Sequence, residues 1–240
     1  MSSLNLPVNR ALLLLALCAF GFLATGCNVA SGVAYFVTPN PTVEAQYEIR
    51  DIPTVIFVDD RRNTVNPVRF RRLIAETASQ DLLDEELVNE VFSPRDADLA
   101  ARKFDRGSTP VEISRIAEAV EAKQIIYVEM IQFVLSRDGV SPDPYASCNI
   151  RVLDLEQRKQ VFPDKKELSE AGEFNVEQTV SGNKSYTLQV SLPSQTSQGL
   201  TDARVRQKLG ESLAEETGHR IAKLFYEHEI PAVGANLIYQ

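Results

Sequence analysis

Short β-branched runs alternate with amphipathic stretches along this chain, and that order limits the folds it can adopt. The clearest runs are "PTVIFVDD" at residues 53–60 and "QIIYVEMIQFVL" at residues 124–135. Such composition predicts buried strands, and the second run is long enough for a central strand. Stretches with apolar residues at helical spacing lie between the runs. Strands linked by helices are typical of parallel pairs, so the pattern predicts an α/β domain.

Three helices and one short strand are expected between residues 60 and 124. Asn66 as the cap and Pro67 in the first helical position predict where the first helix begins. Residues 87–92 predict the strand, and "SPRD" at residues 93–96 has the spacing of a capping box for the second helix. Thr109 and Glu112 repeat this device for the third helix. The predicted core-facing residues of the first and third helices are Phe70, Leu73, Ile74, Thr77, Ile113, Ile116, Ala117 and Val120.

The remaining pattern adds antiparallel partners and a last helix. Residues 146–163 alternate like a hairpin with its bend at 155–159, and residues 185–192 alternate like a further strand. The polar stretch 164–184 predicts a mobile loop, and residues 201–228 predict a long amphipathic helix. The expected fold is one three-layer α/β domain, with a mixed sheet of about five to six strands flanked by helices.

The amino terminus reads as an export signal. Residues 11–25, "ALLLLALCAFGFLAT", carry no charge and lead into Gly26 and Cys27. A weakly basic start, a short apolar run and small residues at its end predict a secretory signal peptide. As a helix the run covers about 22 Å, less than the roughly 30 Å of a bilayer core, which disfavours a permanent transmembrane helix. The small residues before Cys27 resemble a bacterial lipobox, although Ala24 stands where a large aliphatic residue is usual. The alternatives are plain secretion, with cleavage at the same bond, and a cytosolic protein with an apolar start.

These signals divide the chain into four predicted parts. They are a signal peptide at 1–26, a lipid-anchored tether at 27–51, the α/β domain at 52–229 and a tail at 230–240. Asn28 follows the cysteine where an aspartate would favour inner-membrane retention in enteric bacteria. We therefore expect an exported chain, held at the periplasmic face of a membrane by lipid on Cys27, with the outer membrane favoured.

Charge and cysteine content narrow the classes of function. Removing residues 1–26 leaves 33 acidic residues against 24 basic ones, which disfavours non-specific nucleic-acid binding. Cys18 leaves with the signal and Cys27 would carry lipid, so Cys148 alone remains. The sequence thus predicts no disulfide framework, no thiol cluster for a metal and no cofactor.

Asp59 and Asp60 follow the first predicted strand, where open α/β sheets often bind ligands. An acidic pair there could hold Mg²⁺ for phosphoryl transfer. Phosphatases of the haloacid-dehalogenase type need a second aspartate two positions on, and Arg61 occupies that place. The favoured interpretation is that both aspartates are exposed and pair with Arg61 or Arg62.

The two histidines and the remaining cysteine predict no catalytic site. His219 and His228 are nine residues apart and would face opposite sides of one helix. Glu215 and His219 are four residues apart and could bind one metal ion together, but two ligands are too few for a zinc site, so a solvated pair is favoured. Cys148, in an alternating strand, is predicted to be a small buried residue.

Five arginines gather in twelve residues of this acidic chain, at positions 61, 62, 69, 71 and 72. Guanidinium groups bind carboxylates and phosphates through paired hydrogen bonds. Arg61, Arg62, Arg69 and Arg72 are therefore hypothesised to form a binding surface. The alternative is an ordinary solvated face.

The motifs "VIFVDD", "VFSPRD" and "TPVEISRIAEAVEAKQIIYVEM" together resemble a family of envelope lipoproteins. It groups the curli secretion lipoprotein with the penicillin-binding-protein activator, and the amino-terminal domain of TolB is related in shape. The family's "l-G-A-D" before a strand is replaced here by residues 121–124, Glu-Ala-Lys-Gln. The resemblance implies a non-enzymatic envelope protein that works through protein contacts.

The expected function is therefore that of an adaptor or assembly factor with an envelope protein as partner. Homo-oligomerisation stays open. The alternatives are a secreted hydrolase or transferase with an unrecognised active site, and a module that binds the cell wall or a ligand.

Overall fold

The computed structural model describes residues 42–104, 112–138, 141–163, 176–178, 184–193, 200 and 202–229. Contacts divide the chain into two units: Glu44–His228, and a smaller unit that joins Met1–Val43 with Glu229–Gln240. Among the described residues near the termini, β1 (Thr42–Val43) and β9 (His228–Glu229) form a two-stranded sheet. All other elements belong to the larger unit.

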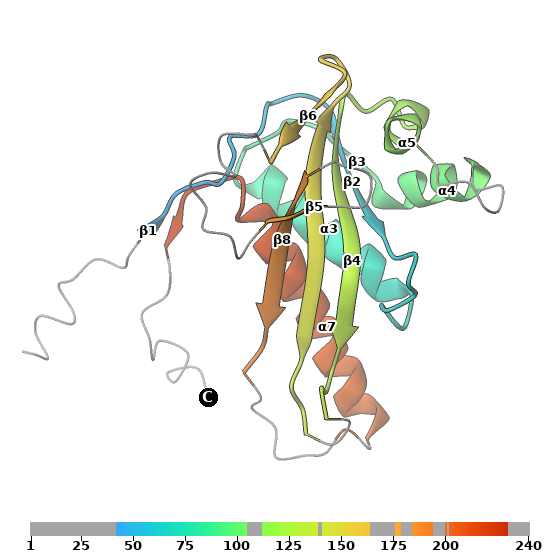
Figure 1. Ribbon diagram of the computed structural model, residues 1–240, viewed down its shortest axis with the longest axis vertical. Coiled ribbons are helices and arrows are strands. Elements are labelled where there is room, and N and C mark those ends of the chain that lie inside the picture. The colour runs from blue at the N-terminus through green and yellow to red at the C-terminus, as the bar shows by residue number, and fades with distance from the viewer. Residues whose placement is uncertain are drawn as a thin grey trace, which may run out of the picture. The chain divides into compact units, whose positions relative to one another are not determined.

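A seven-stranded mixed sheet runs through the larger unit (Figure 1). The strand order is β3-β2-β4-β5-β8-β7, and β6 pairs with β5. Strand β2 pairs in parallel with β3 and β4, whereas the remaining pairs are antiparallel. The strands are β2 (Thr54–Asp59), β3 (Val91–Phe92), β4 (Gln124–Val134), β5 (Tyr145–Asp154), β6 (Lys159–Phe162), β7 (Val176–Gln178) and β8 (Lys184–Ser191).

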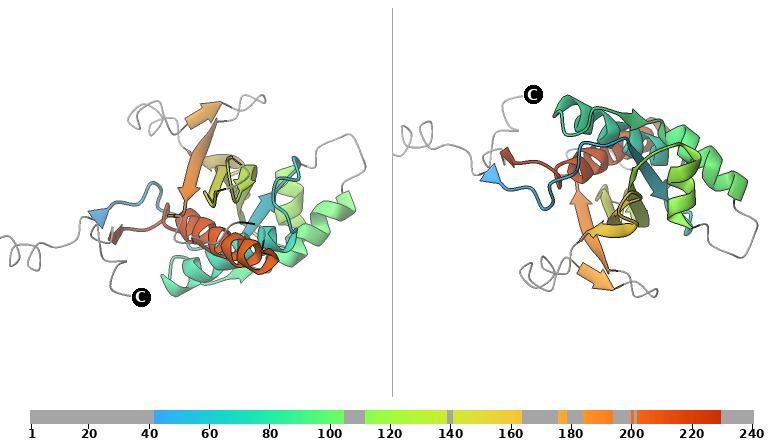
Figure 2. Two further views of the ribbon diagram at one scale, coloured as in Figure 1. Left: turned by 90° about the horizontal axis from the view of Figure 1, so that it is seen from below. Right: turned by 90° about the horizontal axis from the view of Figure 1, so that it is seen from above.

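Helices cover both faces of this sheet (Figure 2). They are α3 (Arg69–Asp84) and α7 (Ala203–Ala222) on one face, and α4 (Pro94–Phe104) and α5 (Ile113–Ala119) on the other. Because side chains alternate along a strand, β4 supplies both cores. Ile126, Val128 and Met130 pack under α3 and α7, and Ile125 and Tyr127 pack under α4 and α5. The predicted three-layer α/β class is confirmed.

Helix α3 begins later than the sequence predicts. It starts at Arg69, and its N-cap residue Val68 makes no side-chain capping bond, so the prediction of Asn66 as the cap is wrong. The buried carboxylate of Asp60 accepts hydrogen bonds from backbone N–H groups of the next loop, and Val65 in that loop is fully buried. The loop therefore occupies the residues that the sequence assigns to the first turn.

Strand β3 is shorter than the predicted strand at 87–92. The chain first closes around the end of α3, where Leu87 N–H donates to Leu82 O at 3.0 Å. Asn89 N–H then donates to the Asp51 carboxylate at 2.8 Å. These contacts leave only Val91–Phe92 to pair with β2.

Two further predictions concern stretches that the structure describes only in part. Val176–Gln178 form strand β7 inside the stretch 164–184 that was predicted as a loop, and the rest of that loop up to residue 183 lies outside the described residues. Thr109 also lies outside them. Glu112 is the N-cap of α5 and makes no side-chain capping bond, so the predicted capping box does not form through it.

The last helix ends six residues before the predicted boundary at 228. The carbonyl oxygen of Leu224 accepts hydrogen bonds from Gln46 N–H at 2.8 Å and Tyr47 N–H at 3.2 Å. Leu224 and Phe225 are buried beyond the helix. The backbone of Gln46 and Tyr47 thus bonds to the carbonyl group that a further helical turn would have used.

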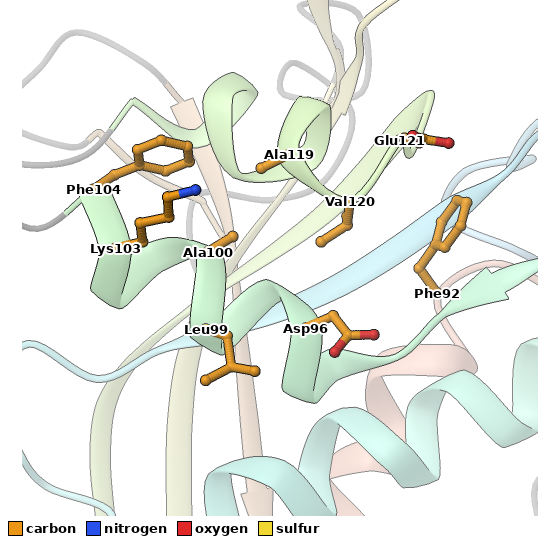
Figure 3. A pocket seen from close by; sticks show the side chains of 9 residues that line it. All are labelled: Phe92, Asp96, Leu99, Ala100, Lys103, Phe104, Ala119, Val120 and Glu121. Atoms are coloured by element: carbon orange, nitrogen blue, oxygen red, sulfur yellow. The ribbon is translucent and has the colours of Figure 1, made fainter.

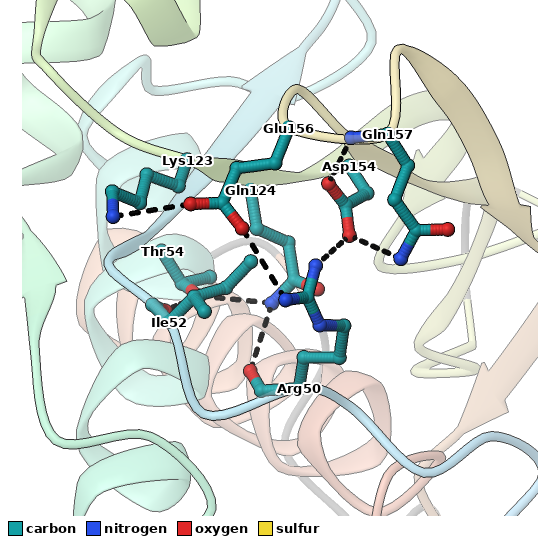
Figure 4. A network of polar contacts seen from close by, with 8 residues as sticks. All are labelled: Arg50, Ile52, Thr54, Lys123, Gln124, Asp154, Glu156 and Gln157. Carbon is teal, nitrogen blue, oxygen red and sulfur yellow. Dashed lines mark hydrogen bonds and ion pairs between the residues drawn. The ribbon is translucent and has the colours of Figure 1, made fainter.

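Residues 44–51, which the sequence assigns to the tether, belong to the larger unit, and Arg50 among them lies in a polar network at the end of the sheet (Figure 4). Arg50 bonds to the fully buried carboxylate of Asp154 and, at 3.3 Å, to Glu156. Lys123 pairs with Glu156 at 3.1 Å. Gln124 donates to Thr54 Oγ1 at 3.0 Å beneath them. This network fixes the entry of the chain into β2.

Candidate functional site

Asp59 lies in a polar cluster at the carboxyl end of β2. Its Oδ2 atom accepts a hydrogen bond from Tyr127 Oη at 2.6 Å and another from Arg61 Nε at 2.8 Å. Burial, and then the charge of Asp59, raise the pKa of Tyr127, so its hydroxyl keeps the proton that it donates. The carboxylate is engaged by two donors, which suits an ion-pair network better than a general base.

Arg151 extends the cluster onto β5. Register pairs Tyr127 with Arg151 and Asp59 with Glu129, so four side chains from three strands share this part of the sheet. The guanidinium of Arg151 lies 4.7 Å from the centre of the Tyr127 ring, and the residue is 8% exposed. Neither Tyr127 nor Arg151 was predicted as a site residue from the sequence. Both residues alternate with their neighbours in the two predicted strands. The sequence does not show the register between these strands, so it does not show that the two side chains are neighbours.

Asp60 is buried, so the prediction that it is an exposed charge is wrong. It is 5% exposed and accepts hydrogen bonds from Thr64 N–H at 2.8 Å, Thr64 Oγ1 at 3.0 Å and Val65 N–H at 2.9 Å. Arg71 Nε lies 3.9 Å from its Oδ2 atom. The carboxylate therefore closes the loop between β2 and α3. Asp59 does pair with Arg61, as predicted, but its side chain is 14% exposed, so the predicted exposure is wrong for Asp59 as well.

The four arginines of the hypothesised binding surface are exposed, and three of them have carboxylate partners. Arg61 pairs with Asp59, Arg69 with Glu211 of α7 at 3.2 Å, and Arg72 with Glu76 at 3.3 Å. Arg62 forms no ion pair within the part of the chain that the structure describes. These four residues, called the arginine surface below, gather where β2 leads into α3.

Cys148 is enclosed in the core, at 1% exposure. Burial raises the pKa of its thiol to about 12, so almost no thiolate exists at neutral pH. A cysteine nucleophile at this position is therefore disfavoured.

The histidines have partners that the sequence analysis did not predict. His219 Nδ1 lies 2.6 Å from Asp81 Oδ2, so its partner comes from α3 and is not Glu215. His228 Nδ1 lies 3.2 Å from the Tyr226 carbonyl oxygen. The described residues hold no group of three or more His, Cys, Asp or Glu side chains placed to bind a metal ion.

None of the helices in the described ranges is long and apolar enough to cross a membrane. Cys27 and the apolar run before it lie outside those ranges, so the prediction of a lipid anchor stays a prediction.

No family model and no curated protein matches this chain. Solved structures match over much of its length. The PelC dodecamer from Paraburkholderia phytofirmans has a TM-score of 0.38 at 11% identity, covering 78% of this chain and 95% of that one. Protein XCC0632 from Xanthomonas campestris has a TM-score of 0.41 at 11% identity, with 78% and 88% covered.

Lipoprotein GNA1162 from Neisseria meningitidis has a TM-score of 0.36 at 10% identity, with 68% and 94% covered. One of these three structures is thus named a lipoprotein, and none of the three is named as a member of the curli secretion group. At TM-scores this low the likenesses assign neither a family nor a function to this chain.

Proposed function

We propose that the chain is a bacterial cell-envelope lipoprotein that acts without catalysis, as an adaptor or assembly factor that contacts other envelope proteins. The observation that carries the proposal is the uncharged run at residues 11–25 that leads into Gly26 and Cys27. The cysteine thiol would carry the diacylglycerol, and the small residues before it would admit the peptidase. The lipid would hold the domain at the periplasmic face of a membrane, with the outer membrane favoured.

The surroundings of the side chains that the sequence nominates for chemistry support contacts over catalysis. Asp59 is bound by Tyr127 and Arg61, and Asp60 closes a loop. Cys148 is enclosed with a raised pKa. The arginine surface, in contrast, is exposed and can exchange its intramolecular carboxylates for those of a partner.

Lipidation is tested by labelling cells with palmitate. The wild-type chain should take up label, and Cys27→Ala should take up none and should accumulate as the uncleaved precursor. Cys148→Ala is the matched control and should label like the wild type, because that thiol is enclosed. Label in Cys27→Ala, or in no variant at all, contradicts the lipid anchor.

Docking through the arginine surface is tested by replacing Arg62, Arg69 and Arg72 together with Ser. The exposed pairs that are lost contribute little to folding, so the melting temperature should stay nearly unchanged. Capture of the partner by crosslinking in intact cells should fall about tenfold, and raised salt should weaken capture by the wild type.

The control for this variant removes three cations from other exposed positions, as Arg95→Ser, Lys159→Ser and Lys208→Ser in one chain. It should capture the partner as the wild type does. Unchanged capture by the arginine-surface variant, or an equal loss in the control, would show that docking occurs elsewhere.

A further inference from the structure

A hollow of about 400 Å³ lies between α4 and α5, next to the edge strand β3 (Figure 3). Its apolar lining comes from Phe92, Leu99, Ala100, Phe104, Ala119 and Val120. Leu99 is 55% exposed, the largest exposed fraction among the large apolar side chains of the described residues. Contiguous apolar surface that reaches solvent is typical of protein–protein interaction sites.

Charged side chains lie at opposite ends of this groove. Asp96 and Glu121 flank the end near Phe92, and Lys103 flanks the end near Phe104 (Figure 3). All three are exposed, and none forms an ion pair within the described ranges. The groove is therefore acidic at one end, apolar in the middle and basic at the other end.

The order of these charges along α4 makes the helix complementary to itself. Asp96 and Lys103 are seven residues apart, which is two helical turns or about 10 Å, and both lie on the face of Leu99 and Ala100. A second α4 laid antiparallel across the first brings each Asp96 next to the other copy's Lys103. The same arrangement places Leu99 of each copy at the two-fold axis, next to the small residue Ala100.

We propose that this groove binds a second copy of the chain, in a two-fold dimer built on antiparallel α4 helices. Such an interface uses the same surface patch on both subunits, which requires this kind of self-complementary charge pattern. Leu99 of each copy would fill the partner's hollow, and the ridges of the two helices would interlock. Pairing through the sheet edge is disfavoured, because β3 offers only Val91–Phe92.

The proposal is tested first by disulfide trapping of Leu99→Cys in the full chain. Broken cells that contain the variant are treated with copper phenanthroline and run on a non-reducing gel. Two cysteines close to a two-fold axis can reach the short separation that a disulfide needs. A band of dimer mass should therefore form. Leu83→Cys replaces another exposed apolar residue, at the end of α3, and should give no such band.

The second test reverses charges in the Leu99→Cys background. Asp96→Lys alone and Lys103→Glu alone each place like charges together twice in a homodimer, and each should reduce the band about tenfold. When the two variants carry different tags and are produced together, both contacts become attractive again. The heterodimer band should then return to the level of Leu99→Cys alone. This recovery is specific to an antiparallel two-fold contact.

Three results would overturn the proposal: no Leu99→Cys dimer, an equal yield from Leu83→Cys, or failure of the mixed charge variants to recover. A crosslink from position 99 to another protein would show that the groove docks a different partner. Palmitate labelling of the same samples measures lipidation independently. A failed dimer test therefore does not contradict the lipid anchor, and a failed labelling test does not contradict the dimer.

Discussion

Asp59 and Asp60 are adjacent in the chain and stabilise different parts of the molecule. Asp59 lies on the strand and joins the side chains of Tyr127 and Arg61 on one face of the sheet. Asp60 lies just beyond the strand and accepts hydrogen bonds from the loop that leads to α3. The alternation of side-chain direction at a strand end explains how one acidic pair serves two environments.

Asp98 on α4 carries an electrostatic cost that a substitution can reveal. Burial raises its pKa above the ordinary 3.8, although Arg102, Arg71 and Arg72 act in the opposite direction. The folded chain thus holds this proton more tightly than the unfolded chain. Below the unfolded pKa the carboxyl is protonated in both states, and Asp98 does not lower the free energy of unfolding through its charge. The cost of burying the charge develops as the pH rises through the raised folded pKa.

Asp98→Asn should therefore raise the free energy of unfolding at pH 7, measured in urea, and the gain should vanish toward pH 3. Asp84→Asn, at an exposed position of α3, serves as the control and should change little. A gain that persists in acid would show that the effect of the substitution does not come from the charge.

At the scale of elements, α3 and α7 pack closely because two glycines of α7 face α3. A Cβ atom at Gly210 would lie 2.8 Å from Phe70 Cζ. A Cβ atom at Gly218 would lie 2.7 Å from the Ile74 carbonyl oxygen and 2.7 Å from Thr77 Cβ. The contact between His219 Nδ1 and Asp81 Oδ2, at 2.6 Å, joins the same two helices. Glycine thus allows α7 to lie against the backbone of α3.

Gly218→Ala should lower the free energy of unfolding by about 1–2 kcal/mol. In an open helix the same change would stabilise by about 1 kcal/mol, so the sign of the measured effect reports the contact. Glu215→Ala on the exposed side of α7 is the control and should be nearly neutral or slightly stabilising. A more stable Gly218→Ala variant would show that the helices separate at little cost.

The element pattern along the sequence predicts much of this fold. The strand at 53–60 appears as β2, the run at 124–135 as the interior strand β4, and the hairpin bend at 155–159 separates β5 from β6. Ile116 and Ala117 are buried, as their helical spacing indicated. Helix and strand type follow from hydrophobic periodicity, which is local in the chain.

Element ends and side-chain partners were less predictable. The first turn of α3 is displaced by the buried Val65, and the end of α7 is set by Gln46 and Tyr47, which are far away in sequence. His219 has an aspartate of another helix as its partner. In each case a long-range contact outweighs a local capping or pairing preference.

For the whole molecule, the sequence by itself predicted the order of strands and helices, apart from β1, β7 and β9, and it predicted export through Cys27. Both predictions depend on contiguous residues. Only the tertiary structure decided the register that joins Asp59, Tyr127 and Arg151, and the groove that α4 forms with α5. Periodicity specifies which face of a strand or helix is buried. Which neighbour covers that face, and at what register, depends on how all layers fill one core.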